Sequence, residues 1–163
     1  MKFLQTSERL AVISMMAMMA CGHAPAAPVA TATPAPRVQL AVIPPDSDAF
    51  PRVAEALSAS LRAAKVSGID DKRVSRVSLE VVQLSIECVD PTSACYEAIG
   101  RSMSANRLLF ARIDTAPPRR QLKITVTLFD VDAKAATRTQ EKVFATEDDA
   151  AAGAAALVAE VAR

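Results

Sequence analysis

The chain has 163 residues, a length that suits one ordinary domain once the amino-terminal stretch is set aside. Hydrophobic residues make up 51% of it, but with no Trp, one Tyr and five Phe the core must be aliphatic, and aromatic platforms for sugars or bases are scarce. Without Lys2 and Arg9 the 19 basic residues fall to 17, and without Glu8 the 18 acidic residues also fall to 17, a balance that argues against a nucleic-acid or polyanion binder.

The amino terminus has the pattern of a secretory signal peptide, which we assign to residues 1–20. Lys2 and Arg9 precede the apolar run LAVISMMAMMA, which is too short to span a bilayer as a helix. Met18-Met19-Ala20-Cys21 then resembles a bacterial lipobox, in which the cysteine is diacylated and becomes the first residue of the mature protein. We therefore predict a lipoprotein anchored at Cys21. The alternative is ordinary cleavage near residues 24–27, which would give a soluble secreted protein.

Residues 21–36 form a second segment, in which the lipidated cysteine is followed by the Pro/Ala-rich stretch GHAPAAPVATATPAP. Its prolines favour an extended polyproline II conformation, so it predicts a tether that holds the domain up to roughly 50 Å from the bilayer. The only histidine of the chain, His23, lies in this tether and is not expected to be a ligand. The third segment, residues 37–163, is predicted to be the folded domain.

Cys88 and Cys95 remain as an even pair once Cys21 carries lipid. In an oxidising compartment such a pair is expected to form a disulfide, which would contribute on the order of 2.5 kcal/mol by loop-closure entropy. Two lone cysteines with no histidine nearby do not suggest a zinc site, and a redox-active pair is more usually Cys-x-x-Cys. Two free thiols in the core are the alternative.

The domain is predicted to begin with a strand and a helix. Residues 37–43 are mostly apolar and end at Pro44-Pro45, a pattern typical of a buried parallel or central strand. The residues that follow offer side-chain caps for a helix (Asp46, Ser47 and Asp48). Its apolar residues recur at helical spacing (Phe50, Val53, Ala54, Leu57, Leu61 and Ala64).

The stretch from residue 69 to residue 88 fits two patterns. Apolar residues alternate as in a strand (Val77, Leu79 and Val81), and an overlapping set shares one helical face (Val77, Val81, Leu84 and Cys88). We favour a short strand near residues 72–75 and then a helix over residues 78–87.

A second helix is predicted to follow at once. Asp90-Pro91 offers a cap and a proline at the first helical position, so this helix should run through Ser104, with Asn106 closing it. Its inward residues are expected to be Cys95, Ala98, Ile99, Ser102 and Met103. The disulfide would then staple the corner between the two helices.

Residues 107–130 predict two strands joined by a tight turn. Residues 108–111 form a continuous apolar run, as in a strand buried on both faces, and Pro117-Pro118 then interrupts it. In the second strand apolar and polar residues alternate, so one face is expected to be wet. Arg119, Arg120 and Lys123 make a small basic patch around this hairpin. It is a candidate contact for an anionic headgroup or a partner, and the alternative is a solvated tip.

The remaining chain predicts an edge strand and a final helix. Residues 137–145, TRTQEKVFA, are mostly polar, which suits a sheet edge whose charges discourage intermolecular pairing. Thr146 should cap the helix, and the acidic residues behind it (Glu147, Asp148 and Asp149) complement its dipole rather than bind a metal. Its inward face is expected to be Ala150, Ala154, Leu157, Val158 and Val161. The fold class is therefore mixed α/β, with about five strands in a mixed sheet and three to four flanking helices.

One string of residues carries a family resemblance: Cys88, Ala94-Cys95, Ile99-Gly100 and Ala105-Asn106, then a hydrophobic strand, a polar hairpin and Phe129-Asp130-Val131-Asp132. It resembles a secreted α/β family related to the TolB amino-terminal domain and the CsgG-like lipoproteins, from Arg37 onward. The chain departs from that family at Asn106, Ala111 and Ala133-Lys134, where Asp, Gly and Thr-Gly are usual. Its alanine-rich style is also similar to uncharacterised myxobacterial lipoproteins. The resemblance implies periplasmic scaffolding or envelope-complex assembly, without catalytic residues.

The sequence holds no pattern that points to catalysis. The four glycines are too scattered for a phosphate-binding loop, and with no histidine beyond the tether a Ser-His-Asp or Cys-His nucleophile cannot be assembled. Asp130 and Asp132 lie two residues apart, which is more typical of a turn with capped amides than of a glycosidase pair. We expect no enzymatic activity, metal or cofactor.

We predict a non-enzymatic lipoprotein of the outer membrane, facing the periplasm, that binds a protein partner or scaffolds an envelope complex and does not bind nucleic acid. The alternative is a secreted protein that binds a small ligand or a cell-wall glycan at the helix N-termini around Asp48 and Asp90. A partner-binding module should expose a contiguous apolar patch or a sheet edge, whereas a ligand binder should have a concave pocket.

Overall fold

The computed structural model describes residues 37–88, 90–117 and 121–163. The predicted signal peptide, Cys21 and the predicted tether lie outside the described residues, and so do Arg119 and Arg120 of the predicted basic patch.

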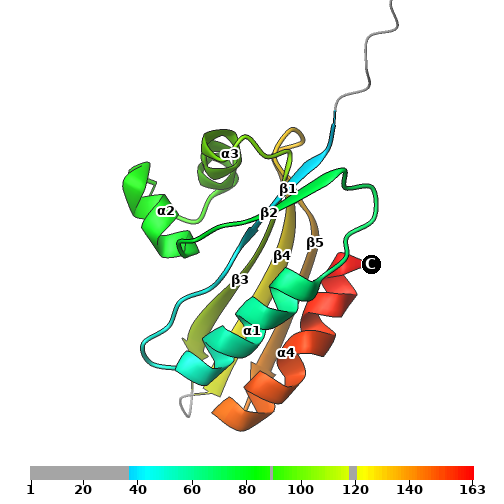
Figure 1. Cartoon of the computed structure of the whole chain (residues 1–163). Coiled ribbons are helices and arrows are strands. Elements are labelled where there is room, and N and C mark those ends of the chain that lie inside the picture. Colours follow the sequence, from blue (N-terminus) through cyan, green and yellow to red (C-terminus); the bar gives the residue numbers. More distant parts are fainter. Residues whose placement is uncertain (1–36, 89, 118–120) are drawn as a thin grey trace, which may run out of the picture. The chain divides into compact units, whose positions relative to one another are not determined.

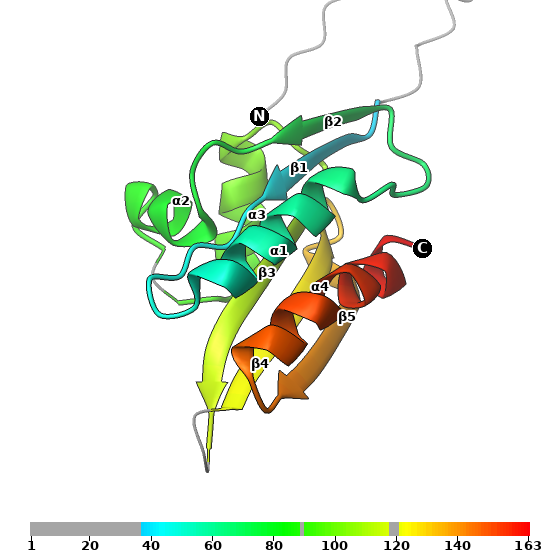
Figure 2. The ribbon, with the colours of Figure 1, turned by 60° about the horizontal axis from the view of Figure 1, so that its bottom comes forward.

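The described residues form a five-stranded mixed sheet and four helices, which confirms the predicted fold class (Figures 1 and 2). The elements follow in the order β1 (Gln39–Ile43), α1 (Pro51–Ala63), β2 (Asp71–Val74), α2 (Leu79–Ser85), α3 (Ser93–Ser102), β3 (Arg107–Ala116), β4 (Gln121–Asp130), β5 (Ala135–Phe144) and α4 (Glu147–Ala162). The strands lie side by side in the order β2-β1-β3-β4-β5. β1 is parallel to β2 and β3, whereas β3, β4 and β5 form an antiparallel meander.

The apolar patterns place the strands as predicted. β3 lies in the middle of the sheet, and its run from Leu108 to Ala111 is buried on both faces. Leu122, Ile124 and Val126 of β4 point into the core on alternate positions. β5 is an edge strand that is exposed along its length except at Phe144, so its charged side chains do face solvent.

Helices α1 and α4 lie side by side over one face of the sheet (Figure 1). The buried residues of α1 are Val53, Ala54, Leu57 and Leu61, all of them predicted to point inward. All five residues predicted for the inner face of α4 are also buried. Thr146 caps α4, because its Oγ1 accepts a hydrogen bond from the Asp149 amide at 3.1 Å.

Helices α2 and α3 cover part of the opposite face, above a second core of buried apolar side chains (Ala41, Ile43, Leu108, Phe110, Phe129 and Val131). The predicted start of α3 is wrong. Thr92, rather than Asp90, is its N-cap, and Thr92 Oγ1 accepts a hydrogen bond from Cys95 N at 3.2 Å. Ala98 and Ser102 are exposed, and Gly100 is buried instead.

The predicted capping of α1 is also wrong. The N-cap is Phe50, which makes no side-chain cap, and Asp46 and Asp48 are exposed. Of the three predicted residues only Ser47 contributes, because its Oγ accepts a hydrogen bond from Phe50 N at 3.1 Å, just ahead of the helix. A carboxylate does reach this helix end, but it comes from α4: Glu147 Oε1 accepts a hydrogen bond from Arg52 N at 3.2 Å. The tertiary contact between two helix N-termini therefore replaces the local cap.

Asn106 joins three segments instead of closing α3, which ends at Ser102. Its Oδ1 accepts a hydrogen bond from Gln39 N at 3.1 Å, and its Nδ2 donates one to Asp132 Oδ2 at 3.0 Å. An aspartate here would lack the amide donor and would face the Asp132 carboxylate.

Candidate functional site

Helix α2 is short, and one of its sides is held against the sheet. Ser78 caps it, with Oγ accepting a hydrogen bond from Val81 N at 3.5 Å. Leu79 and Val82 are buried in the core beneath α2 and α3. The predicted strand near residues 72–75 and the helix over residues 78–87 are therefore confirmed as β2 and α2.

The opposite side of α2 is apolar and exposed. Val81 and Leu84 lie on this side, with exposed fractions of 47% and 69%. Val77, which precedes the Ser78 cap, is 44% exposed. Val74, at the end of β2, is 39% exposed. We call these four residues the β2–α2 surface. Within the described part of the chain the only other large exposed hydrophobic residue is Val143 on β5, so four of these five side chains belong to this one segment.

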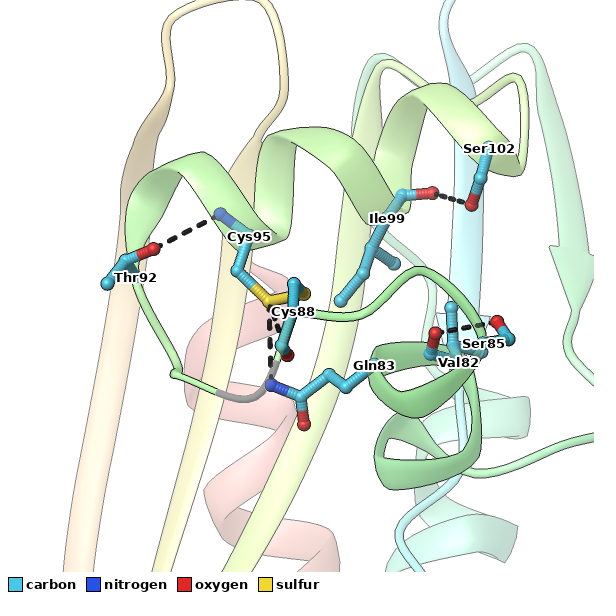
Figure 3. Close-up of a disulfide and its surroundings, with 8 residues drawn as sticks. All are labelled: Val82, Gln83, Ser85, Cys88, Thr92, Cys95, Ile99 and Ser102. Carbon is cyan, nitrogen blue, oxygen red and sulfur yellow. Dashed lines mark hydrogen bonds between the residues drawn. A yellow bond between two sulfur atoms is a disulfide. The ribbon is translucent and has the colours of Figure 1, made fainter.

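The predicted disulfide between Cys88 and Cys95 is present and fixes the end of α2 to the first turn of α3 (Figure 3). The two Cα atoms are 5.5 Å apart. Gln83 lies on the last turn of α2 and directs its side-chain Nε2 to Cys95 Sγ at 3.6 Å. The main-chain carbonyl of Gln83 accepts a hydrogen bond from Cys88 N at 2.9 Å. These links hold the apolar side of α2 in one orientation.

Both sheet edges are charged, which makes them poorer candidates for strand pairing than the β2–α2 surface. On β2, Asp71 pairs with Arg73 at 3.1 Å. Lys72 Nζ donates hydrogen bonds to the carbonyl oxygens of Arg62, at 2.6 Å, and Ala64, at 2.9 Å, so it caps the C-terminal end of α1. On β5, Glu141 pairs across the sheet with Lys123 of β4 at 3.4 Å.

The predicted basic patch at the hairpin is described only at Lys123. That residue lies on β4, and its ammonium group is engaged by the Glu141 carboxylate. Arg119 and Arg120 lie outside the described residues. A contact of this hairpin with a headgroup or a partner stays a prediction.

Asp130 and Asp132 form a turn with capped amides, as predicted. Asp130 Oδ1 accepts hydrogen bonds from Asp132 N at 3.0 Å and Ala133 N at 2.9 Å, and it pairs with Arg107 at 2.8 Å. Asp132 pairs with Arg101 at 3.4 Å. Both carboxylates are thus engaged in joining the β4–β5 turn to neighbouring elements.

Neither of the residues proposed for the ligand-binding alternative, Asp48 and Asp90, is a helix cap. Asp48 does line a shallow depression of about 250 Å³, together with Ser78 and Glu80 at the start of α2. A groove of about 680 Å³ lies between α1 and α4. Alanines make up much of its lining, and its polar residues are Ser60, Ser67, Lys65 and Arg163. The Ser60 hydroxyl already donates a hydrogen bond to the Ala56 carbonyl at 2.8 Å.

Tyr96, the chain's only tyrosine, packs under α3 against Phe110 and Phe129, with ring centroids 4.7 and 5.5 Å away. Burial raises the pKa of its phenol above the ordinary value, although the neighbouring Arg112 guanidinium acts in the opposite direction. The phenol is therefore neutral at physiological pH, and its role is packing.

The described residues lack the features of a metal site and of a membrane-spanning helix. Three or more His, Cys, Asp or Glu side chains do not come together there in a way that would hold a metal ion. None of the described helices has both the length and the apolar character needed to cross a bilayer.

Comparison with known proteins leaves the family open. No protein-family model and no curated protein matches the sequence. Among solved structures, the PelC dodecamer from Paraburkholderia phytofirmans is 18% identical, with 77% of this chain and 85% of that chain covered and a TM-score of 0.37. The C-terminal domain of LpoB from Salmonella enterica is 14% identical, with 67% and 83% covered and a TM-score of 0.43. Likenesses of this size do not establish a shared fold or function.

Proposed function

We propose that this protein is a lipid-anchored, non-enzymatic component of a bacterial cell envelope that binds a protein partner through the β2–α2 surface. The exposed apolar side of α2 is the observation that carries the proposal. Aliphatic side chains gathered on one exposed segment are characteristic of interaction sites, because covering them removes apolar area from water. The disulfide supports this role, since it holds the segment ready for a partner without further ordering.

The proposed location rests on the amino-terminal sequence. The signal-peptide pattern, the lipobox-like residues before Cys21 and the Pro/Ala-rich stretch together describe an exported, anchored domain on a tether. A structural disulfide agrees with export, because such bonds persist mainly in oxidising compartments. We place the domain in the periplasm, attached to the outer membrane.

The anchor is tested by the intact mass of the protein from the membrane fraction of cells that naturally carry it. We expect a chain that begins at Cys21 and carries lipid. It should gain two alkyl groups from an alkylating reagent only after reduction, because Cys88 and Cys95 are bonded to each other. A lipid-free chain that begins beyond Cys21 would exclude the anchor and leave a secreted protein.

The partner surface is tested by photo-crosslinking in the same cells, with the crosslinking residue at position 77. We expect one dominant crosslinked protein, and we expect that product to be lost in Leu84→Gln, which removes the most exposed apolar side chain of α2. The matched control is Val143→Gln, which removes an exposed aliphatic residue from β5 instead and should leave the product unchanged. A product that survives Leu84→Gln, or none at all, contradicts the proposal.

A further inference from the structure

The β2–α2 surface is bordered by carboxylates from two separate segments. Asp46 and Asp48, in the loop between β1 and α1, line the same depression of about 250 Å³ as Glu80 and Val81 of α2. Both aspartates are exposed, and so is Glu80. An apolar side chain of the β2–α2 surface therefore lies directly beside three acidic groups.

The acidic character continues past the other end of α2. From Val77 to Gly100 the chain has four carboxylates and neither Lys nor Arg. Glu97 is neutralised by Arg101 at 3.9 Å and Lys134 at 3.0 Å. Glu87 and Asp90 follow α2 and are exposed. Two bases flank Val74 at the β2 end of the surface: Arg73, which pairs with Asp71 at 3.1 Å, and the exposed Arg76. The acidic excess therefore belongs to the α2 side of the surface, from Val77 onward.

These carboxylates are also uncommitted within the domain. In the described part of the chain, ion pairs do not include Asp46, Asp48, Glu80, Glu87 or Asp90. Asp130, Asp132 and Glu141 do pair with bases, whereas the exposed Glu55 of α1 and Glu160 of α4 resemble the border residues in being outside these ion pairs. The charge beside the β2–α2 surface is thus available to a partner.

We propose that the partner segment held by the β2–α2 surface is an amphipathic, basic one, with apolar side chains that cover Val77, Val81 and Leu84 and lysines or arginines that meet the acidic border. This inference rests on the proposed function and adds the chemistry of the partner. The same border disfavours an anionic membrane as the occupant, because lipid phosphates and the carboxylates would repel each other.

The probe is a synthetic amphipathic helical peptide of leucine and lysine, matched by a peptide in which glutamate replaces every lysine. Binding to the full chain is measured by fluorescence anisotropy. We expect the lysine peptide to bind and the glutamate peptide to bind at least about tenfold more weakly, a difference of roughly 1.4 kcal/mol. Leu84→Gln should also weaken the binding of the lysine peptide. Equal affinity for the two peptides would overturn the proposal.

The acidic border is tested by two double variants of equal net charge. Asp48→Asn/Glu80→Gln should lower the affinity for the lysine peptide about fivefold. The control, Glu55→Gln/Glu160→Gln, changes exposed positions of α1 and α4 and should alter that affinity less than about twofold. Because Glu80 lies in the first turn of α2, Asp46→Asn/Asp48→Asn, which leaves the helix intact, serves as a second variant with the same expectation. Equal losses in the border and control variants would show a non-specific charge effect and overturn the proposal.

The two proposals fail in distinguishable ways. If position 77 still crosslinks a Leu84-dependent partner while the border variants change neither the crosslink nor the affinity for the lysine peptide, the partner surface stands and its basic occupant is excluded. If vesicles of anionic lipid bind the chain in a Leu84-dependent manner and the lysine peptide does not bind, the occupant is a membrane and the inference is wrong.

Discussion

Gly100→Ala is expected to destabilise the domain by about 3 kcal/mol, the upper end of the usual cost of overpacking. The buried glycine of α3 lies directly against Val131, and an added Cβ would be 2.8 Å from Val131 Cγ1 and closer still to Cγ2. Val131 is fully buried in the core beneath α2 and α3, so making room for the added methyl group would displace packed core side chains. In an open helix the same change would stabilise by about 1 kcal/mol, but here the steric clash decides the sign.

Urea unfolding of Gly100→Ala, Val131→Ala and the double variant measures this contact. Val131→Ala alone should cost about 2 kcal/mol through the cavity it leaves. In the double variant the alanine methyl at position 100 takes up the space vacated at position 131. The double variant should therefore lose less free energy of unfolding than the sum of the two single losses, by more than about 1 kcal/mol. Ser102→Ala, on the exposed side of α3, is the control and should change little. A Gly100→Ala chain as stable as the parent would show that α3 or the β4–β5 turn shifts at little cost, and would contradict the prediction.

Cys88→Ala/Cys95→Ala should lower the free energy of unfolding by about 2.5 kcal/mol through loop-closure entropy. The bond joins residues only seven positions apart, but it connects two short helices whose other shared contacts are few. α2 is otherwise anchored by its two buried residues, Leu79 and Val82. The loss of stability should therefore be uneven, and local unfolding of α2 should become easier by more than local unfolding of the rest of the domain.

Two measurements separate the global effect from the local one. The urea midpoint of the parent chain should move toward that of the double variant when a reductant is added, whereas the variant itself should not respond. Hydrogen exchange should accelerate in α2 far more than in α4, which packs on the other face of the sheet. An unchanged midpoint on reduction would mean that the bond adds no stability. Uniform acceleration would mean that it does not hold α2 locally.

The strands and the long helices could be predicted because their patterns are local and their surroundings ordinary. The alternation in β4, the continuous apolar run in β3 and the inner face of α4 each follow from a period of two or about 3.6 residues. The charged edge strand β5 could be recognised by the same means. Cysteine counting anticipated the disulfide, because an even pair in an exported chain has a simple outcome.

The candidate site could not be read from the same patterns. The stripe of Val77, Val81 and Leu84 was visible as one helical face, but α2 also has a second apolar set, Leu79 and Val82, and either set fits a core. Only the packing of α2 on the sheet buries one set and exposes the other. The acidic border escapes sequence inspection as well, since Asp48 and Glu80 belong to different segments that come together in the fold.

The sequence by itself determined where the apolar and polar residues recur, and through them the five strands, the four helices and the capping of α4 by Thr146. Tertiary structure decided which side of α2 faces water, that Glu147 serves the first turn of α1, and that Asn106 ties the start of β1 to the β4–β5 turn. The physical reason is range, because periodicity and capping act within a few neighbouring residues. Glu147 and Arg52, by contrast, are 95 positions apart in the sequence and meet only in the folded domain.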